Sequence, residues 1–153
     1  MNADYLNPIL VAVKNTFGTM IGIEVLPGKP IIKKEASPSF EVNGRINLSG
    51  AIGGSIFISI PRKLSLLLAS CLLDEEKDDL DDDCIDAIKE ITNMIVGNAK
   101  SNFPNDEIRI SVPELFIGND GIIFPIGCPV ISMPFSSDEG ESFEVDVALK
   151  TNT

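Results

Sequence analysis

Three segments place apolar residues at intervals of three and four, which is typical of amphipathic helices. The first predicted helix begins at Asn7-Pro8 and ends near 18–22. The second covers 62–73, and the third covers about 84–103. Proline is tolerated at the first position of a helix and disfavours helical geometry in the residue before it. We therefore expect Asn7 to cap the first helix and Pro104 to follow the end of the third. Most apolar residues of 62–73 are expected in the core.

The other apolar runs are short and predict strands. Extended segments are expected over 31–34, 40–42, 45–49, 55–60, 108–112, 114–117, 130–135 and 142–149, with a glycine-rich hairpin connection over 50–54 and turns over 118–121 and 136–140. The order of helix, strands, two helices and strands lacks the regular alternation of a parallel sheet. It predicts one α+β domain over residues 1–153, with a mainly antiparallel sheet and about three helices.

The charge balance and the cysteines narrow the possible partners and compartment. The chain has 12 Lys and Arg against 23 Asp and Glu, a formal net charge of -11, which argues against binding nucleic acid or an anionic membrane surface. Its three cysteines form no CxxC pair, which fits a reducing cytoplasm and gives no structural zinc site. No apolar run approaches the roughly 20 residues that span a bilayer. We expect a cytoplasmic protein in which the acidic run 74–83 is a solvated connection or a helix start.

The sequence contains no histidine. The side chain that most often acts as a general base at neutral pH is therefore missing, and catalysis would depend on carboxylates, amides or groups from a partner. A GxxxxGK(S/T) phosphate loop and a GxSxG elbow are also absent from the sequence. Cys84 falls on the apolar side of the third helix and is expected to be an inert thiol.

A polar stripe runs along the third predicted helix. At about 100° per residue, one side of this helix carries Asp86, Glu90, Asn93, Gly97 and Lys100, and the opposite side carries Cys84, Ile88, Ile91, Ile95 and Ala99. Glu90 and Asn93 are three residues apart and can address one external target together. Gly97 lowers helix propensity by roughly 1 kcal/mol relative to Ala, which is understandable if another molecule approaches the backbone there. Asn98 is expected near the buried flank as a structural residue. On spacing alone, an ordinary solvent-facing surface is the simpler interpretation.

These residues resemble the core motif of the CheC/CheX/FliY family of bacterial chemotaxis phosphatases. The motif has an acidic residue or Ser, then Glu four residues later and Asn three residues after that, as in Asp86, Glu90 and Asn93. The first helix with 20–25, the hairpin over 46–56 and the segment 110–118 also resemble the family, in the same order. The CheC branch has two Glu-x-x-Asn helices, whereas the first twenty residues here contain no Glu. The resemblance is therefore to the CheX branch, with a CheC/CheX-like fold.

The resemblance implies a phosphatase that hydrolyses the aspartyl phosphate of a CheY-type response-regulator receiver domain. It implies that Asn93 orients the attacking water and that Glu90 docks on a lysine of the receiver. Because the receiver would bring its own Mg²⁺, no metal or cofactor is expected in this chain. Gly97 and Asp86 are expected to face the partner, and a purely solvated Asp86 is an equal alternative.

Two other interpretations stay open. A non-enzymatic module of the same fold could bind a receiver or a flagellar component without hydrolysis, although such a module has no need for the amide of Asn93. A homodimer in which edge strands, such as 145–149, pair into a continuous sheet is compatible with the phosphatase. The identity of the receiver and of the signalling pathway does not follow from the sequence.

Overall fold

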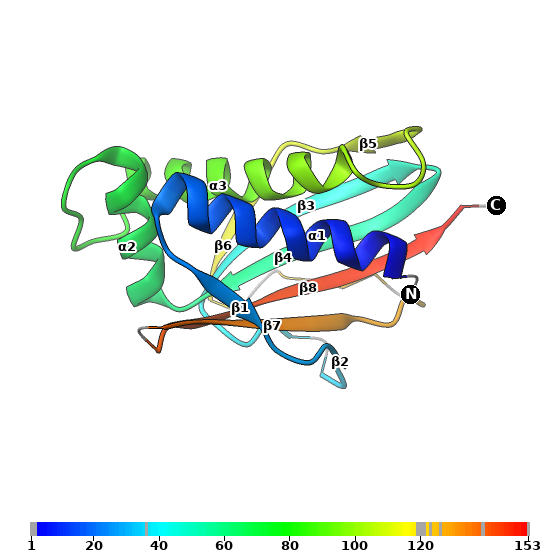
Figure 1. Ribbon diagram of the computed structural model, residues 1–153, viewed down its shortest axis with the longest axis horizontal. Coiled ribbons are helices and arrows are strands. Elements are labelled where there is room, and N and C mark those ends of the chain that lie inside the picture. Colours follow the sequence, from blue (N-terminus) through cyan, green and yellow to red (C-terminus); the bar gives the residue numbers. More distant parts are fainter. Residues whose placement is uncertain are drawn as a thin grey trace.

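The computed structural model describes residues 3–35, 37–118, 122, 124–125, 127–138 and 140–152 (Figure 1). The helical elements are α1 (Ala3–Thr16), the π-helical turn η1 (Phe17–Ile21), α2 (Arg62–Leu73) and α3 (Asp82–Lys100). The strands are β1 (Val25–Pro27), β2 (Ile31–Ile32), β3 (Val42–Gly50), β4 (Ile52–Ile60), β5 (Ile108–Ile110), β6 (Glu114–Ile117), β7 (Ile131–Ser137) and β8 (Ser142–Thr151). Most predicted elements are therefore present, with shifted ends.

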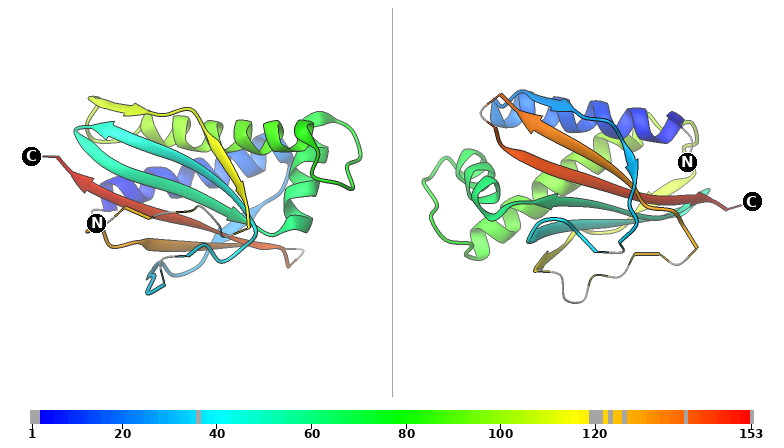
Figure 2. Two further views of the ribbon diagram at one scale, coloured as in Figure 1. Left: turned by 180° about the vertical axis from the view of Figure 1, so that it is seen from behind. Right: turned by 90° about the horizontal axis from the view of Figure 1, so that it is seen from below.

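The strands form one antiparallel sheet, and two long helices cover one of its faces. The strand order is β1-β7-β8-β4-β3-β5, with β2 also paired to β7 and β6 also paired to β3. Helices α1 and α3 lie side by side over the sheet, and α2 lies across one end (Figure 1). Seen from below, both long helices are on the same side of the strands (Figure 2). The predicted α+β architecture with an antiparallel sheet is confirmed.

The first helix starts earlier than the sequence predicts. It begins at Ala3, so Asn7 does not cap it and Pro8 lies inside it. Proline removes one helical hydrogen bond, and packing of the first turn offsets this loss. Tyr5 is buried, and its ring lies 5.2 Å from the ring of Phe103 in an edge-on contact. The predicted end is right, because η1 extends the helix to Gly22, which has a left-handed backbone with φ of 76°.

The central hairpin is tighter than the glycine-rich segment 50–54 suggests. Strand β3 continues to Gly50, and β4 begins at Ile52, so one residue separates them. Gly50 has φ of 100°, and a Cβ there would overlap the carbonyl oxygen of Glu107. Glycine is thus required at this turn both for its backbone conformation and for space.

The strand 142–149 is central, and the prediction that 145–149 forms a pairing edge is wrong. β8 pairs with β4 on one side and with β7 on the other. Its alternate residues Val145 and Val147 join the main core on the helix side, whereas Ala148 packs with Phe57 in a smaller cluster. Both faces of the strand are therefore covered, which is why apolar residues of both faces, such as Val147 and Ala148, are buried. The outer strands are β1 and β2 at one edge and β5 and β6 at the other.

Two further strand predictions need correction. Of the expected strand 31–34 only Ile31–Ile32 is extended, and the expected 40–42 is mostly a bend that leads into β3. β1 has no counterpart among the predictions, because three residues are too few to show alternation. The predicted turn 118–121 keeps Gly118 with φ of 85°, and its remaining residues lie outside those described.

Helix α2 has its predicted bounds but a narrower buried face than expected. Leu64 and Leu68 are buried, whereas Leu67 is 38% exposed and Cys71 is exposed. The helix lies at the end of the molecule, so only one stripe of it meets the core. The expectation that its apolar residues are mostly core is therefore only partly right.

Candidate functional site

The candidate site lies on α3, the longest helix, which is fixed at both ends. Asp81 caps its N-terminus, since its carboxylate accepts a hydrogen bond of 2.9 Å from the backbone N–H of Cys84. Asp82 and Asp83 fill the first turn and Lys100 the last, as the helix dipole favours. The acidic run 74–83 thus ends as a helix start, one of its two expected roles.

The predicted two faces of α3 are confirmed by burial. The apolar face is buried through Cys84, Ala87, Ile88, Ile91, Thr92, Ile95, Val96 and Ala99. On the other side, Asp86 and Glu90 are exposed, and Asn93 and Gly97 are half-buried. In the described part of the chain, no side-chain hydrogen bond or ion pair engages Asp86, Glu90 or Asn93. A carboxylate and an amide are thereby presented together, with their bonding groups available to another molecule.

Gly97 lies on the same face of α3, and neither packing within the chain nor its backbone conformation requires glycine at this position. Apart from its chain neighbours and the backbone of its own helix, no described atom would lie within 4 Å of a Cβ at Gly97. Its backbone is helical, without the left-handed φ that favours glycine. The roughly 1 kcal/mol that glycine costs in a helix is therefore not explained by packing within the chain.

A surface hollow of about 480 Å³ begins at Gly97 and continues beside the C-terminal end of α3. Its lining includes Lys100, Phe103 and Asp106, and Ile110 of β5. The stripe therefore leads into a concavity with both apolar and charged walls.

Asn98 does not lie near the buried flank, contrary to the sequence prediction. It is exposed, and it lines a shallow groove between α3 and α1 together with Val11 and Asn15. Asn98 lies in the last turn of α3, which ends at Lys100, and the groove leaves its side chain open to solvent there. α1 contains no Glu, and the described helices place a Glu-x-x-Asn pair only on α3.

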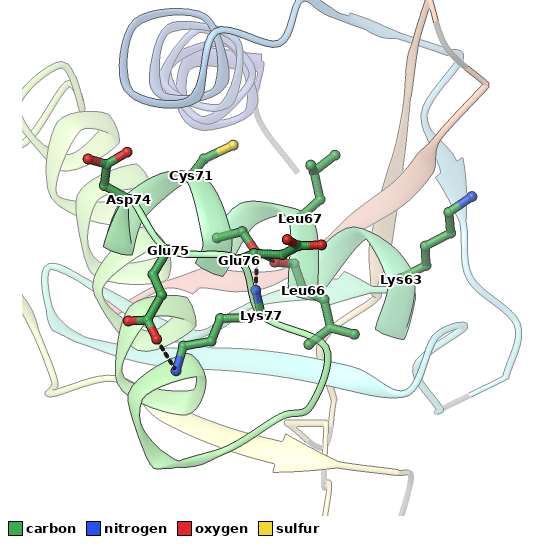
Figure 3. A pocket seen from close by; sticks show the side chains of 9 residues that line it. Lys63, Leu66, Leu67, Cys71, Asp74, Glu75, Glu76 and Lys77 are labelled. Carbon is green, nitrogen blue, oxygen red and sulfur yellow. Dashed lines mark hydrogen bonds and ion pairs between the residues drawn. The ribbon is translucent and has the colours of Figure 1, made fainter.

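A larger hollow of about 700 Å³ lies elsewhere, between α2 and the connection that follows it (Figure 3). Lys63, Leu67 and Cys71 line it from α2, and Glu75 and Lys77 from the connection. The Lys77 ammonium lies 3.6 Å from the Glu75 carboxylate. None of the stripe residues contributes to this hollow, so it is separate from the candidate site.

The cysteine chemistry agrees with the sequence prediction for Cys84. Its thiol is buried and donates to the carbonyl oxygen of Asp79 at 3.2 Å. Burial raises the pKa of this thiol, which disfavours the reactive thiolate. Cys84 is thus an inert part of the packing under α3.

Metal ligands and membrane spans can be assessed for the described residues. Among them, no group of three or more His, Cys, Asp or Glu side chains is arranged to hold a metal ion. No helix in the same part of the chain combines the length and the apolar character that crossing a membrane requires.

Comparison with known proteins decides the family. The model of the family described as "Chemotaxis phosphatase CheX" matches residues 42–136, which include all of α3 and its stripe. The chain belongs to the CheX family. The resemblance inferred from Asp86, Glu90 and Asn93 is thereby confirmed at the level of the family.

Three relatives illustrate this likeness over nearly full lengths. The CheY-P phosphatase CheX of Thermotoga maritima is 26% identical, over 99% of both chains. A CheC-like superfamily protein from a Shewanella species is 31% identical, covering 98% of this chain and 99% of that one, with a TM-score of 0.85. A chain of the CheX-CheY-BeF3-Mg²⁺ complex from Borrelia burgdorferi is 29% identical, covering 97% of this chain and 99% of that one, with a TM-score of 0.83.

Proposed function

We propose that this protein is a phosphatase that hydrolyses the aspartyl phosphate of a CheY-type response-regulator receiver domain. The main support is a helix face, in a member of a chemotaxis phosphatase family, whose Glu90 and Asn93 side chains have no hydrogen-bond or ion-pair partner among the described residues. Relatives named as a CheY-P phosphatase and as a CheX-CheY complex support the choice of substrate. The reaction needs little covalent chemistry from the protein, since phosphoryl transfer depends mainly on positioning and charge stabilisation. A chain without histidine can therefore perform it.

Asn93 orients the attacking water in this proposal. Its amide carries both a carbonyl acceptor and N–H donors, so it can hold a water molecule by one of its hydrogens and fix its direction. In line with the departing carboxylate, such a water attacks the phosphorus and the bond to the aspartyl oxygen breaks. Holding the water in place contributes through proximity and orientation, without proton abstraction by Asn93.

Glu90 docks the helix on the receiver. Its exposed carboxylate would pair with a lysine near the phosphorylated aspartate, one turn of the helix from Asn93. Because the two side chains are rigidly linked through the helix, this ion pair would also set the position of the water. Glu90 would therefore contribute to both affinity and turnover.

The receiver supplies the electrophile and Mg²⁺, so this chain contributes no cofactor of its own. The named components of the Borrelia complex, which include CheY and Mg²⁺, support this division. Gly97 would leave room for a loop of the receiver, and Asp86 would contact the receiver at the start of the stripe. A purely solvated role for Asp86 remains the alternative.

We further propose that residues 1–153 form one phosphatase domain that works in the cytoplasm, where receivers are found. We also propose that it forms a homodimer through an outer strand of the sheet. With β8 in the centre, the candidate edges are β1 with β2 and β5 with β6. Sedimentation of the purified chain, compared with variants carrying proline in either edge, would identify the edge that pairs.

The experiment that tests the function is a time course of phosphate release from a panel of phosphorylated receivers of the same organism. The protein should shorten the lifetime of at least one aspartyl phosphate, and the Asn93→Ala variant should not. A non-enzymatic binding module is the competing function. Binding to a phosphorylated receiver without any change in its lifetime, across the whole panel, would favour that module.

A further inference from the structure

Helix α3 approaches the sheet most closely at one glycine. Gly44 of β3 lies under Thr92, and a Cβ at Gly44 would overlap Thr92 Oγ1 and lie 3.1 Å from both Cβ and Cγ2. Both residues belong to the buried layer between the helix and the sheet. Because Gly44 has only a hydrogen atom in place of a side chain, this turn of α3 can pack close to the sheet.

Neither partner of this contact can move aside. Thr92 is fully buried, its hydroxyl donates to the carbonyl oxygen of Ile88 at 2.9 Å, and β-branched side chains have few allowed rotamers in a helix. Gly44 is held from both sides, because it pairs with Ile58 on β4 and with Leu115 on β6. An added methyl group would therefore push the helix itself.

The displacement would affect the turn of α3 that contains Glu90 and Asn93. Thr92 immediately precedes Asn93 and follows Glu90 by two residues, while Ile88 and Ile95 anchor the helix in the core on either side. A load at one residue of a helix fixed at both flanks bends it locally. It would change the direction of the Asn93 amide relative to Glu90, and leave most of the surface in place.

We propose that Gly44 is a positioning residue of the phosphatase, whose missing side chain seats Thr92 and so aims Asn93 at the water. This inference rests on the proposed function of Asn93. Gly44 makes no contact with the receiver in this proposal and acts only through the helix. Its backbone does not have the left-handed φ that favours glycine, so alanine adds steric conflict with Thr92 and no backbone strain.

The test is a series of three variants assayed with the cognate phosphorylated receiver: Gly44→Ala, Thr92→Ala and the double variant. Gly44→Ala should lower kcat by about 10- to 100-fold, as expected for a displacement of up to about 1 Å, with little change in KM. Thr92→Ala removes the atoms that would conflict with a methyl group at Gly44, and it is the reference for the double variant. The double variant should recover most of the loss and stay a few-fold below Thr92→Ala, since the conflict with Oγ1 and Cγ2 is gone but a 3.1 Å contact with Cβ remains.

Two controls separate positioning from a general loss of stability. Gly28→Ala adds a methyl group 3.0 Å from Pro134 Cγ, away from α3, and should leave kcat unchanged. If Gly44→Ala does not fold, the double variant is compared with Thr92→Ala, and a several-fold lower kcat in the double variant supports the proposal. The proposal is overturned if Gly44→Ala folds and keeps the wild-type kcat. If Gly44→Ala does not fold, it is overturned when the double variant and Thr92→Ala have equal kcat. Asn93→Ala is run in parallel, because unchanged turnover there would refute the proposed function itself.

Discussion

The ammonium of Lys33 lies 2.9 Å from the Asp146 carboxylate, a pair that joins the connection after β2 to the central strand β8. Asp146 is fully buried on the sheet face opposite to Val145 and Val147. Burial raises the pKa of Asp146, and the bonds from Ser132 and Lys33 oppose that rise. Lys33 also lies 3.3 Å from Glu144 and 3.1 Å from the hydroxyl of Ser39. One cation therefore holds a loop against the sheet and compensates a buried charge.

Replacing Lys33 with Met should destabilise the protein by about 3 kcal/mol at pH 7, because it leaves the Asp146 carboxylate buried without its cation. The loss should shrink on acidification. Without Lys33 the pKa of Asp146 rises further, so the protonated acid is tolerated at low pH and the cost appears as pH increases through that pKa. Urea unfolding at about pH 4 and pH 7 measures the difference. Lys34→Met, which alters an exposed neighbour, is the control.

Gly97→Ala should make the free protein more stable and the enzyme slower. Outside its chain neighbours and the backbone of its own helix, the methyl group meets no described atom within 4 Å, and it gains roughly 1 kcal/mol of helix propensity, so the free energy of unfolding should rise. If Gly97 gives clearance to the receiver, the same methyl group weakens docking, and Gly97→Leu weakens it more. Thermal unfolding and receiver affinity are measured together. Gly18→Ala, at another open position, is the control, and unchanged affinity in both Gly97 variants would assign the glycine no role in access.

The sequence predicts α3 well because its information is local. The alternation of Ile88, Ile91 and Ile95 with Glu90 and Asn93 defines both faces of the helix, and burial follows that pattern. Since the motif lies within one helix, its spacing alone places the two side chains together. Spacing alone still favours an ordinary solvent-facing surface, and the resemblance to a known family is what selects Glu90 and Asn93 as the candidate site.

The features of the fold that the sequence does not predict depend on contacts between segments that are distant in the chain. Lys33 and Asp146 are 113 residues apart, and Gly44 meets Thr92 across two elements, so no local pattern links them. The central position of β8 depends on strand order, which alternation within a strand does not encode. The early start of α1 is a similar case, because the contact of Tyr5 with Phe103 outweighs a proline signal.

Acid should destabilise the N-terminus of α3, because it protonates the capping carboxylate of Asp81. Its carboxylate accepts from Lys77 Nζ at 2.9 Å and from the N–H of Cys84, and these bonds lower its pKa to about 2. A carboxylate with a lowered pKa stabilises the fold above its unfolded value near 3.8 and loses that contribution as pH falls through about 2. Unfolding curves over this range should show a smaller acid dependence for Asp81→Asn, which retains a capping oxygen.

The adjacent Asp82→Asn is the matched control for that experiment, because Asp82 is exposed and does not cap the helix. Added salt should reduce the Lys77 contribution, since both groups are near the surface. An equal acid dependence of Asp81→Asn and the wild type would show that the capping pair does not govern acid stability.

Asn93→Ala and Glu90→Ala should have different effects on kcat and on receiver affinity. Asn93→Ala should lower kcat by about 100-fold with a modest change in receiver affinity, because only the oriented water is lost. Glu90→Ala should lower both kcat and affinity, because the docking pair is lost and the water is displaced with it. Single-turnover decay of the receiver phosphate at saturating protein separates the two quantities. Asn98→Ala removes an exposed amide from the same helix and should behave as wild type. If Asn98→Ala and Asn93→Ala have equal rates, the amide at 93 has no special part in the reaction.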